Sequence, residues 1–102
     1  MTRKQKTICE NLGWNVLYDE NDIILSQYSP AGEDFFFYAE KARFKDSVKE
    51  YAEDFDPDEH AIMWIENMHT VKGVPQSIRT LIDDADAIKE MLTELSEQIN
   101  KI

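Results

Sequence analysis

Hydrophobic positions near the start of the chain recur with a helical period. Ile8, Cys9 and Leu12 fall on one face of a helix over residues 3 to 13, and Gly13 stands where a left-handed residue would end it. From Trp14 onward the period changes to two, which predicts a strand over residues 14–18 and a turn in the polar segment 19–22. The chain therefore starts with a short amphipathic helix that leads directly into a sheet.

Two further runs of β-branched and aromatic residues, 23–28 and 35–39, predict a second and a third strand. Between them lies Ser29-Pro30-Ala31-Gly32, a turn sequence in which Gly32 suits a positive φ. Three consecutive strands with short loops favour an antiparallel meander. Because the third run has aromatic residues on both faces, we expect it to be central or to lie under helices.

The second half of the sequence predicts three helices. One begins near Phe44 and keeps an apolar stripe through Phe55, and the next is opened by a capping sequence with Asp56 as N-cap and Pro57 at the first helical position. We expect His60 in that helix to stack on Trp64 or to be exposed. Residues 72–75 interrupt the pattern, and Ser77 can cap a last helix.

The last helix carries an apolar seam with alternating spacings of three and four, made of Ile78, Leu81, Ala85, Ile88, Leu92, Leu95, Ile99 and Ile102. Such a seam can pack inside the domain or pair with a second chain. We expect its first half to pack internally and Leu92, Leu95 and Ile99 to be partly available for weak homodimerisation.

Together these elements predict one α+β domain over residues 1–102: an N-terminal helix, a three-stranded antiparallel meander over about residues 14–39, then three helices with a long C-terminal helix. The predicted core consists of Trp14, Val16, Leu25, Phe35, Phe37, Val48, Phe55, Ile62, Ile65, Leu81 and Ile88.

The charge of the chain restricts its partners. The 102 residues include 21 Asp and Glu against 11 Lys and Arg, a formal net charge of -10, which argues against direct binding to nucleic acid or an anionic membrane. A basic protein is the natural partner of such a surface. A single cysteine, no signal peptide and no apolar run long enough to span a membrane predict a cytoplasmic protein.

Catalytic and metal-binding motifs are absent from the sequence. Asp54, Asp56 and Asp58 alternate as in a calcium loop, but Glu59 stands where that loop needs Gly and Ile65 where it needs Glu. Cys9 falls on an apolar stripe, where a buried inert thiol is the common case. We therefore expect no enzyme, no cofactor and no metal.

Acidic density is the feature that exceeds an ordinary surface. Residues 46–59 contain seven carboxylates and one Lys, and residues 83–97 contain six carboxylates and one Lys. Carboxylates at i and i+4 of a helix lie about 6 Å apart along its axis, comparable to neighbouring phosphates on one strand. The expected partner-binding residues are Glu50, Glu53, Asp54, Asp56, Asp58, Glu59, Asp83, Asp84 and Asp86.

Three segments, 28–35, 48–60 and 73–79, resemble those of small acidic bacterial proteins found on mobile elements, and the resemblance covers about residues 12–96. Proteins of this size and charge on such elements include anti-CRISPR and anti-restriction inhibitors. The resemblance implies an inhibitor of a defence nuclease, with a CRISPR nuclease as the suspected partner, and it assigns no catalytic residue. The carboxylate spacing predicts that such an inhibitor would act as a nucleic-acid mimic. The alternative is a small helical adaptor that pairs through its C-terminal seam.

Overall fold

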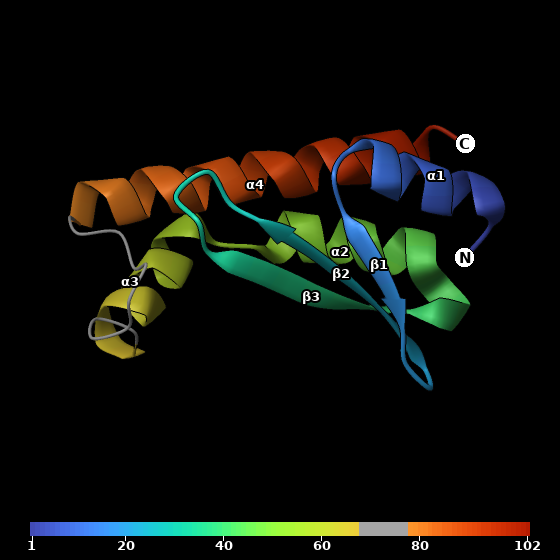
Figure 1. Cartoon of the computed structure of the whole chain (residues 1–102), viewed down its shortest axis with the longest axis horizontal. Helices are drawn as coiled ribbons and strands as arrows, with labels where there is room; N and C mark the ends of the chain where they lie inside the picture. The colour runs from blue at the N-terminus through green and yellow to red at the C-terminus, as the bar shows by residue number, and fades with distance from the viewer. Residues whose placement is uncertain (68–77) are drawn as a thin grey trace.

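The structure is a computed structural model that describes the backbone of residues 1–67 and 78–102 and the side chains of residues 1–64 and 79–102. In these ranges the chain forms α1 (Arg3–Asn11), β1 (Asn15–Tyr18), β2 (Asp22–Tyr28), β3 (Asp34–Glu40), the 3-10 turn η1 (Lys41–Arg43), α2 (Phe44–Asp54), α3 (Pro57–Asn67) and α4 (Ile78–Asn100). The predicted α+β order is confirmed (Figure 1). The predicted break at residues 72–75 and the cap at Ser77 lie outside the described residues.

The sheet is the predicted antiparallel meander, with strand order β1-β2-β3. Its register places Val16 opposite Leu25 and Leu25 opposite Phe37. The second loop contains Gly32 at a φ of +95°, the left-handed conformation that the turn sequence predicts.

β3 is an edge strand, so of the two expectations for the third strand the central position is wrong. The alternative, a strand under helices, holds for the one face on which α2 packs. Its residues alternate strictly: Phe35 and Phe37 are buried, whereas Phe36 and Tyr38 are about half exposed. Among the described elements, helices pack on one face of this strand only, and its aromatic residues Phe36 and Tyr38 on the other face are exposed. The aromatic content of the strand predicts that both of its faces are covered, but in the described part of the chain one face is exposed.

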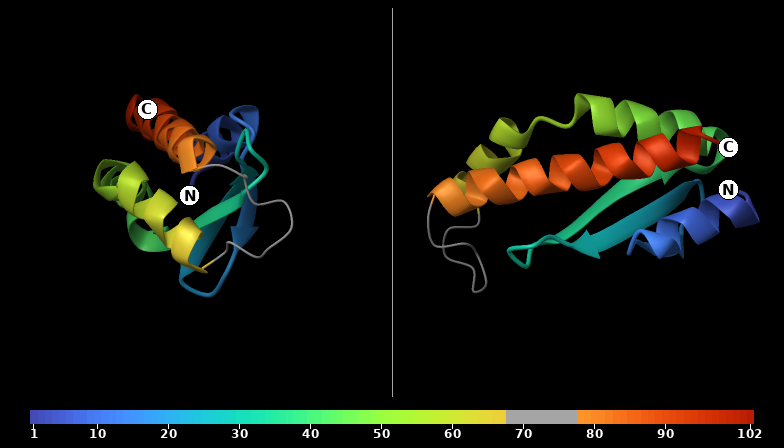
Figure 2. Two further views of the ribbon diagram at one scale, coloured as in Figure 1. Left: turned by 90° about the vertical axis from the view of Figure 1, so that its left-hand side faces the viewer. Right: turned by 90° about the horizontal axis from the view of Figure 1, so that it is seen from above.

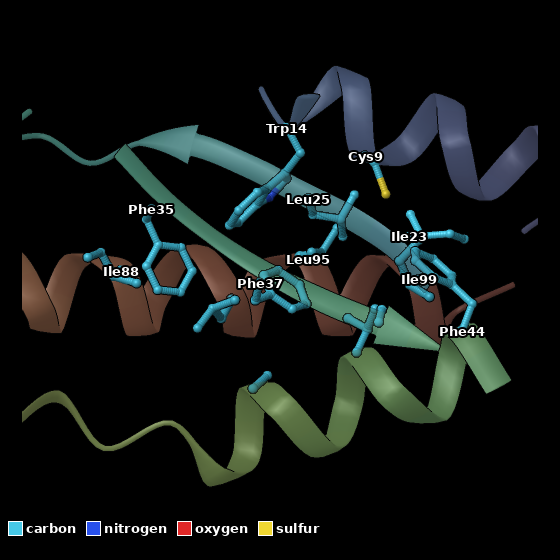
Figure 3. Packing of buried hydrophobic residues seen from close by; sticks show 14 residues of the cluster. Cys9, Trp14, Ile23, Leu25, Phe35, Phe37, Phe44, Ile88, Leu95 and Ile99 are labelled. Carbon is cyan, nitrogen blue, oxygen red and sulfur yellow. The ribbon is translucent and has the colours of Figure 1, made fainter. Parts of the chain in front are cut away.

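The molecule has two layers, a sheet and a helical layer in which α2 and α4 lie side by side across one face of it (Figures 1 and 2). Between the layers lies the hydrophobic core, where Trp14 contacts Phe35 and Phe37 edge to face (Figure 3). Of the predicted core residues, these are buried: Trp14, Leu25, Phe35, Phe37, Val48, Leu81 and Ile88. Val16 and Phe55 are half-buried and pack against the cluster.

Ile62 is 53% exposed, which makes its assignment to the core wrong. α3 packs on α4 through Ala61, which forms a small cluster with Leu81 and Ala85. This contact turns the position after Ala61 toward solvent. The side chain of Ile65, also predicted in the core, lies outside the described residues.

Local signals set the helix ends. Thr2 and Gln5 form a reciprocal capping box at the start of α1, and Gly13 follows this helix with a φ of +91°. Asp56 caps α3 as predicted, because its Oδ1 accepts hydrogen bonds from the backbone N–H groups of Asp58 and Glu59, at 3.0 and 3.4 Å.

The seam of α4 is covered by the chain itself. Leu92, Leu95 and Ile99 are completely buried, so the expectation that they are partly available is wrong. The reason is the length of α4: its 23 residues extend past α1, α2 and α3, and all three pack against it. From Leu81 to Ile99 the seam is a core stripe, whereas Ile102 lies beyond the end of α4 and is 47% exposed. The adaptor hypothesis, which depends on an available seam, loses its structural basis.

Candidate functional site

The acidic residues predicted on α2 are exposed, but they are not equally free. Glu50 accepts a hydrogen bond from the Arg43 guanidinium at 2.7 Å, and the same guanidinium reaches Glu40 at 2.9 Å. Glu50, followed by Glu40, raises the pKa of Arg43. Glu53 and Asp54 form no salt bridge with a described residue and are the unpaired carboxylates at the end of α2.

At the start of α3, Asp56, Asp58 and Glu59 are all exposed. The carboxylate of Asp56 is occupied by the capping hydrogen bonds, whereas Asp58 and Glu59 lie in the first turn, where the helix dipole favours negative charge. Two of these three carboxylates are therefore available to a partner.

α4 carries the longest continuous set of carboxylates. Its solvent-facing side presents the exposed residues Asp83, Asp86, Glu90, Glu94 and Glu97, spaced by three or four positions. This set, called here the α4 acidic stripe, runs for about 21 Å along the helix at 1.5 Å per residue. Of these five residues, only Asp83 and Asp86 were predicted as site residues. The stripe lies on the face of α4 opposite the hydrophobic seam, so the same helical periodicity in the sequence could have indicated it.

Lys89 is the one Lys within the span of the stripe, and it points away from it. Its Nζ donates hydrogen bonds to the backbone carbonyls of Ala52 and, at 3.3 Å, of Glu53. These carbonyls belong to the last turn of α2, where helix C-termini attract cations. Within the described residues, no Lys or Arg forms a salt bridge with the stripe. The one Lys in this segment of the sequence therefore does not neutralise the charge of the stripe through a salt bridge.

The two acidic regions flank one groove. A shallow groove of about 330 Å³ runs between α2 and α4, and its lining includes Glu53 from α2 and Glu97 from α4. Lys49 and Lys89 also line it. The unpaired carboxylate of α2 and the end of the α4 acidic stripe thus lie on the same side of the molecule.

Asp84 is 7% exposed and cannot belong to an exposed acidic surface. Its Oδ2 accepts a hydrogen bond from the Ser29 hydroxyl at 2.7 Å, and its Oδ1 accepts one from the Ala31 backbone N–H at 2.9 Å. It therefore ties the loop between β2 and β3 to α4. A structural role for Asp84 therefore replaces the predicted role in partner binding.

A second buried carboxylate, Glu33, holds the same loop to α3. Both of its oxygens lie within 3.0 Å of Nε2 of His60, and Phe35 and Phe55 pack around the imidazole. His60 therefore contacts Glu33 and these rings, not Trp64 as expected from the sequence. The partner lies 27 residues away in sequence, so no local pattern could have found it.

Other chemistry is limited in the described part of the chain. Cys9 is fully buried, and burial raises the pKa of its thiol to about 11, so the reactive thiolate is suppressed. Among residues whose side chains the structure describes, no three His, Cys, Asp or Glu are grouped as metal ligands. No described helix is long and apolar enough to cross a membrane.

Comparison with protein-family models, with curated proteins and with solved structures gives no significant match to this chain.

Proposed function

We propose that the protein is a non-enzymatic inhibitor that binds the basic nucleic-acid channel of a nuclease, with a CRISPR nuclease as the suspected target. The observation that carries the proposal is the α4 acidic stripe, five exposed carboxylates in line without a described cation paired to them. Its contacts with a partner are extended by Glu53, Asp54, Asp58 and Glu59 of α2 and α3.

The spacing of the stripe supports mimicry of a phosphate backbone. Successive carboxylates are separated by about 4.5 or 6 Å along the helix axis. A Lys- and Arg-lined channel that follows a nucleic-acid strand presents cations at a comparable repeat. Several cations can then be neutralised at once by one rigid helix.

The rigidity of α4 adds to this fit. The residues opposite the stripe, Leu92, Leu95 and Ile99, are completely buried, so the helix is held by the core along its length. Little conformational entropy is then lost when the stripe binds, which favours affinity. The net charge of -10 also steers the chain toward a basic channel.

A cleavage assay tests this function. A CRISPR nuclease loaded with guide RNA is incubated with labelled target DNA and increasing amounts of the protein, at low and at high salt. We expect inhibition that weakens steeply with salt, because the contacts are charge pairs. The double variant Glu90→Gln/Glu94→Gln should inhibit about tenfold less well at low salt.

The matched control is Glu10→Gln/Glu20→Gln, which removes the same charge from exposed positions outside the stripe. It should inhibit within about twofold of the parent, because only long-range steering changes. Equal inhibition by the stripe variant and the parent, or no inhibition of any nuclease at low salt, would rule out the mimic mechanism.

A further inference from the structure

In the described part of the chain, the sheet face that points away from α2 and α4 carries exposed apolar side chains, together with the polar residues Asn15 and Ser26. The outward-facing side chains of the three strands include Leu17, Tyr28, Phe36 and Tyr38, which are 58%, 69%, 55% and 51% exposed, together with the half-buried Ile24. We call these five residues the open sheet face. In Figure 1, α2 lies behind the strands and α4 runs above them.

Four of the five residues, Leu17, Ile24, Phe36 and Tyr38, are contiguous, and Tyr28 lies at the end of β2 opposite Asp34. Leu17, Ile24 and Tyr38 are direct neighbours across the three strands by register, and the Phe36 and Tyr38 ring centroids are 6.2 Å apart. Large contiguous apolar patches on a soluble domain mark interaction sites, whereas scattered apolar residues are ordinary. The core on the other face accounts for folding, so this patch needs another explanation.

Charge at the ends of the open sheet face indicates which partner it suits. Asp22 and Glu40 are paired beyond one end of it, and Asp34 lies opposite Tyr28 at the other end. No outward-facing residue of the three strands is Lys or Arg. Arg43 neutralises Glu40, which leaves Asp22 and Asp34 as the unpaired carboxylates among these residues.

We propose that the open sheet face binds an amphipathic helix of a basic partner. The apolar stripe of this helix would cover Leu17, Phe36 and Tyr38, and Lys or Arg residues at its ends would meet Asp22 and Asp34. A seven-residue strand is about 23 Å long and three strands are about 14 Å wide, which accommodates one helix of about 16 residues and about 10 Å diameter. Such a helix would give the sheet a helical layer on both faces.

A second copy of this chain suits the face less well. Each copy would bring a net charge of -10 and the same acidic residues to the contact, so like charges would oppose one another. This binding site is distinct from the α4 acidic stripe, and each can be tested without the other.

The test uses a synthetic helical peptide of about 16 residues, with one Leu stripe and Lys elsewhere. Its binding to the full chain is measured by calorimetry and by amide chemical shifts. We expect the shifts to map to the outward-facing residues of β2 and β3. The variant Phe36→Thr/Tyr38→Thr, which keeps residues suited to strands, should bind the peptide about tenfold more weakly.

Two controls separate this surface from general acidity. The Glu90→Gln/Glu94→Gln variant should bind the peptide within about twofold of the parent, and a peptide with Glu in place of Lys should bind about tenfold more weakly than the basic one. Unchanged binding by the Thr variant, or shifts confined to α4, would overturn the proposal. The proposal would also be overturned if the chain formed a dimer in sedimentation, or bound a single-stranded oligonucleotide, and if Phe36→Thr/Tyr38→Thr abolished that association.

Discussion

Cys9 is a side chain whose ionisation is opposed by the fold. Its thiol lies in the core between α1 and the sheet, and burial raises its pKa from 9.0 to about 11 (Figure 3). A thiol with a raised pKa holds its proton more tightly in the folded chain than in the unfolded chain. The free energy of unfolding therefore falls with rising pH over the range in which the thiol ionises in the unfolded chain but stays protonated in the folded chain.

This linkage predicts a loss of stability in alkali. The contribution of Cys9 is complete below pH 9 and is lost as the pH rises through 11, at about 1.4 kcal/mol per pH unit. Urea unfolding between pH 8 and 11 measures it. In Cys9→Ala the fall should be shallower, and identical slopes for parent and variant would contradict the assignment. Tyr51, whose pKa is also raised by burial, acts in the same direction in both proteins.

The Glu33 and His60 pair shows what residue-scale prediction from sequence cannot reach. The position of His60 on a helix followed from the Asp56 cap, but its partner depends on how the loop between β2 and β3 meets α3. The same applies to Asp84, which the sequence predicts as a surface carboxylate. In the structure it is buried and accepts hydrogen bonds from Ser29 and Ala31. Composition predicts charge, whereas tertiary contacts decide which charges are free.

Removal of His60 should destabilise the protein, because it leaves Glu33 buried without its partner. We expect His60→Ala to lower the free energy of unfolding by about 3 kcal/mol, as for other broken buried pairs. The double variant Glu33→Gln/His60→Ala should recover part of the loss, since a neutral amide costs less to bury than a carboxylate. A double variant less stable than His60→Ala would argue against this account; urea unfolding decides.

At the scale of elements, the periodicities predicted the helices, the meander and the apolar seam of α4, because these patterns are local. They did not predict which faces become covered. The alternation in β3 is strict, yet Phe36 and Tyr38 are exposed because the helices lie on one side only. α3 has apolar residues on more than one face, and it packs against α4 with the face that contains Ala61. Ile62 is therefore exposed.

The covered seam of α4 leads to a prediction about assembly. Leu92 is completely buried within one chain, so Leu92→Ala should cost about 3 kcal/mol of unfolding free energy. Ile82, which is 39% exposed on the same helix, is the control, and Ile82→Ala should cost less than about 1 kcal/mol. Both values should be independent of protein concentration; a concentration-dependent Tm would instead indicate that the seam holds a dimer.

At the scale of the whole molecule, the α4 acidic stripe lies on the helical layer, and the exposed aromatic side chains of the open sheet face lie on the sheet. The sheet side also carries carboxylates, among them Asp22 and Asp34. The sequence predicted the excess of charge and the class of fold. The periodicity of one helix indicates the α4 acidic stripe, whereas the sequence could not predict the open sheet face, because packing of the two layers decides which face of the sheet the helices cover.

Net charge acts on folding and on binding in opposite directions. With a charge of -10, carboxylates repel one another in the compact state, and salt screens this repulsion. Raising NaCl from about 0.05 to about 0.5 M should increase Tm by about 4 °C, while the same change weakens inhibition of a nuclease. Glu90→Gln/Glu94→Gln should show a smaller rise in Tm, because neighbouring charges of the stripe are already removed. Thermal scans by circular dichroism measure this, and a Tm that falls with salt would mean that attractive ion pairs, not repulsion, dominate the folded surface.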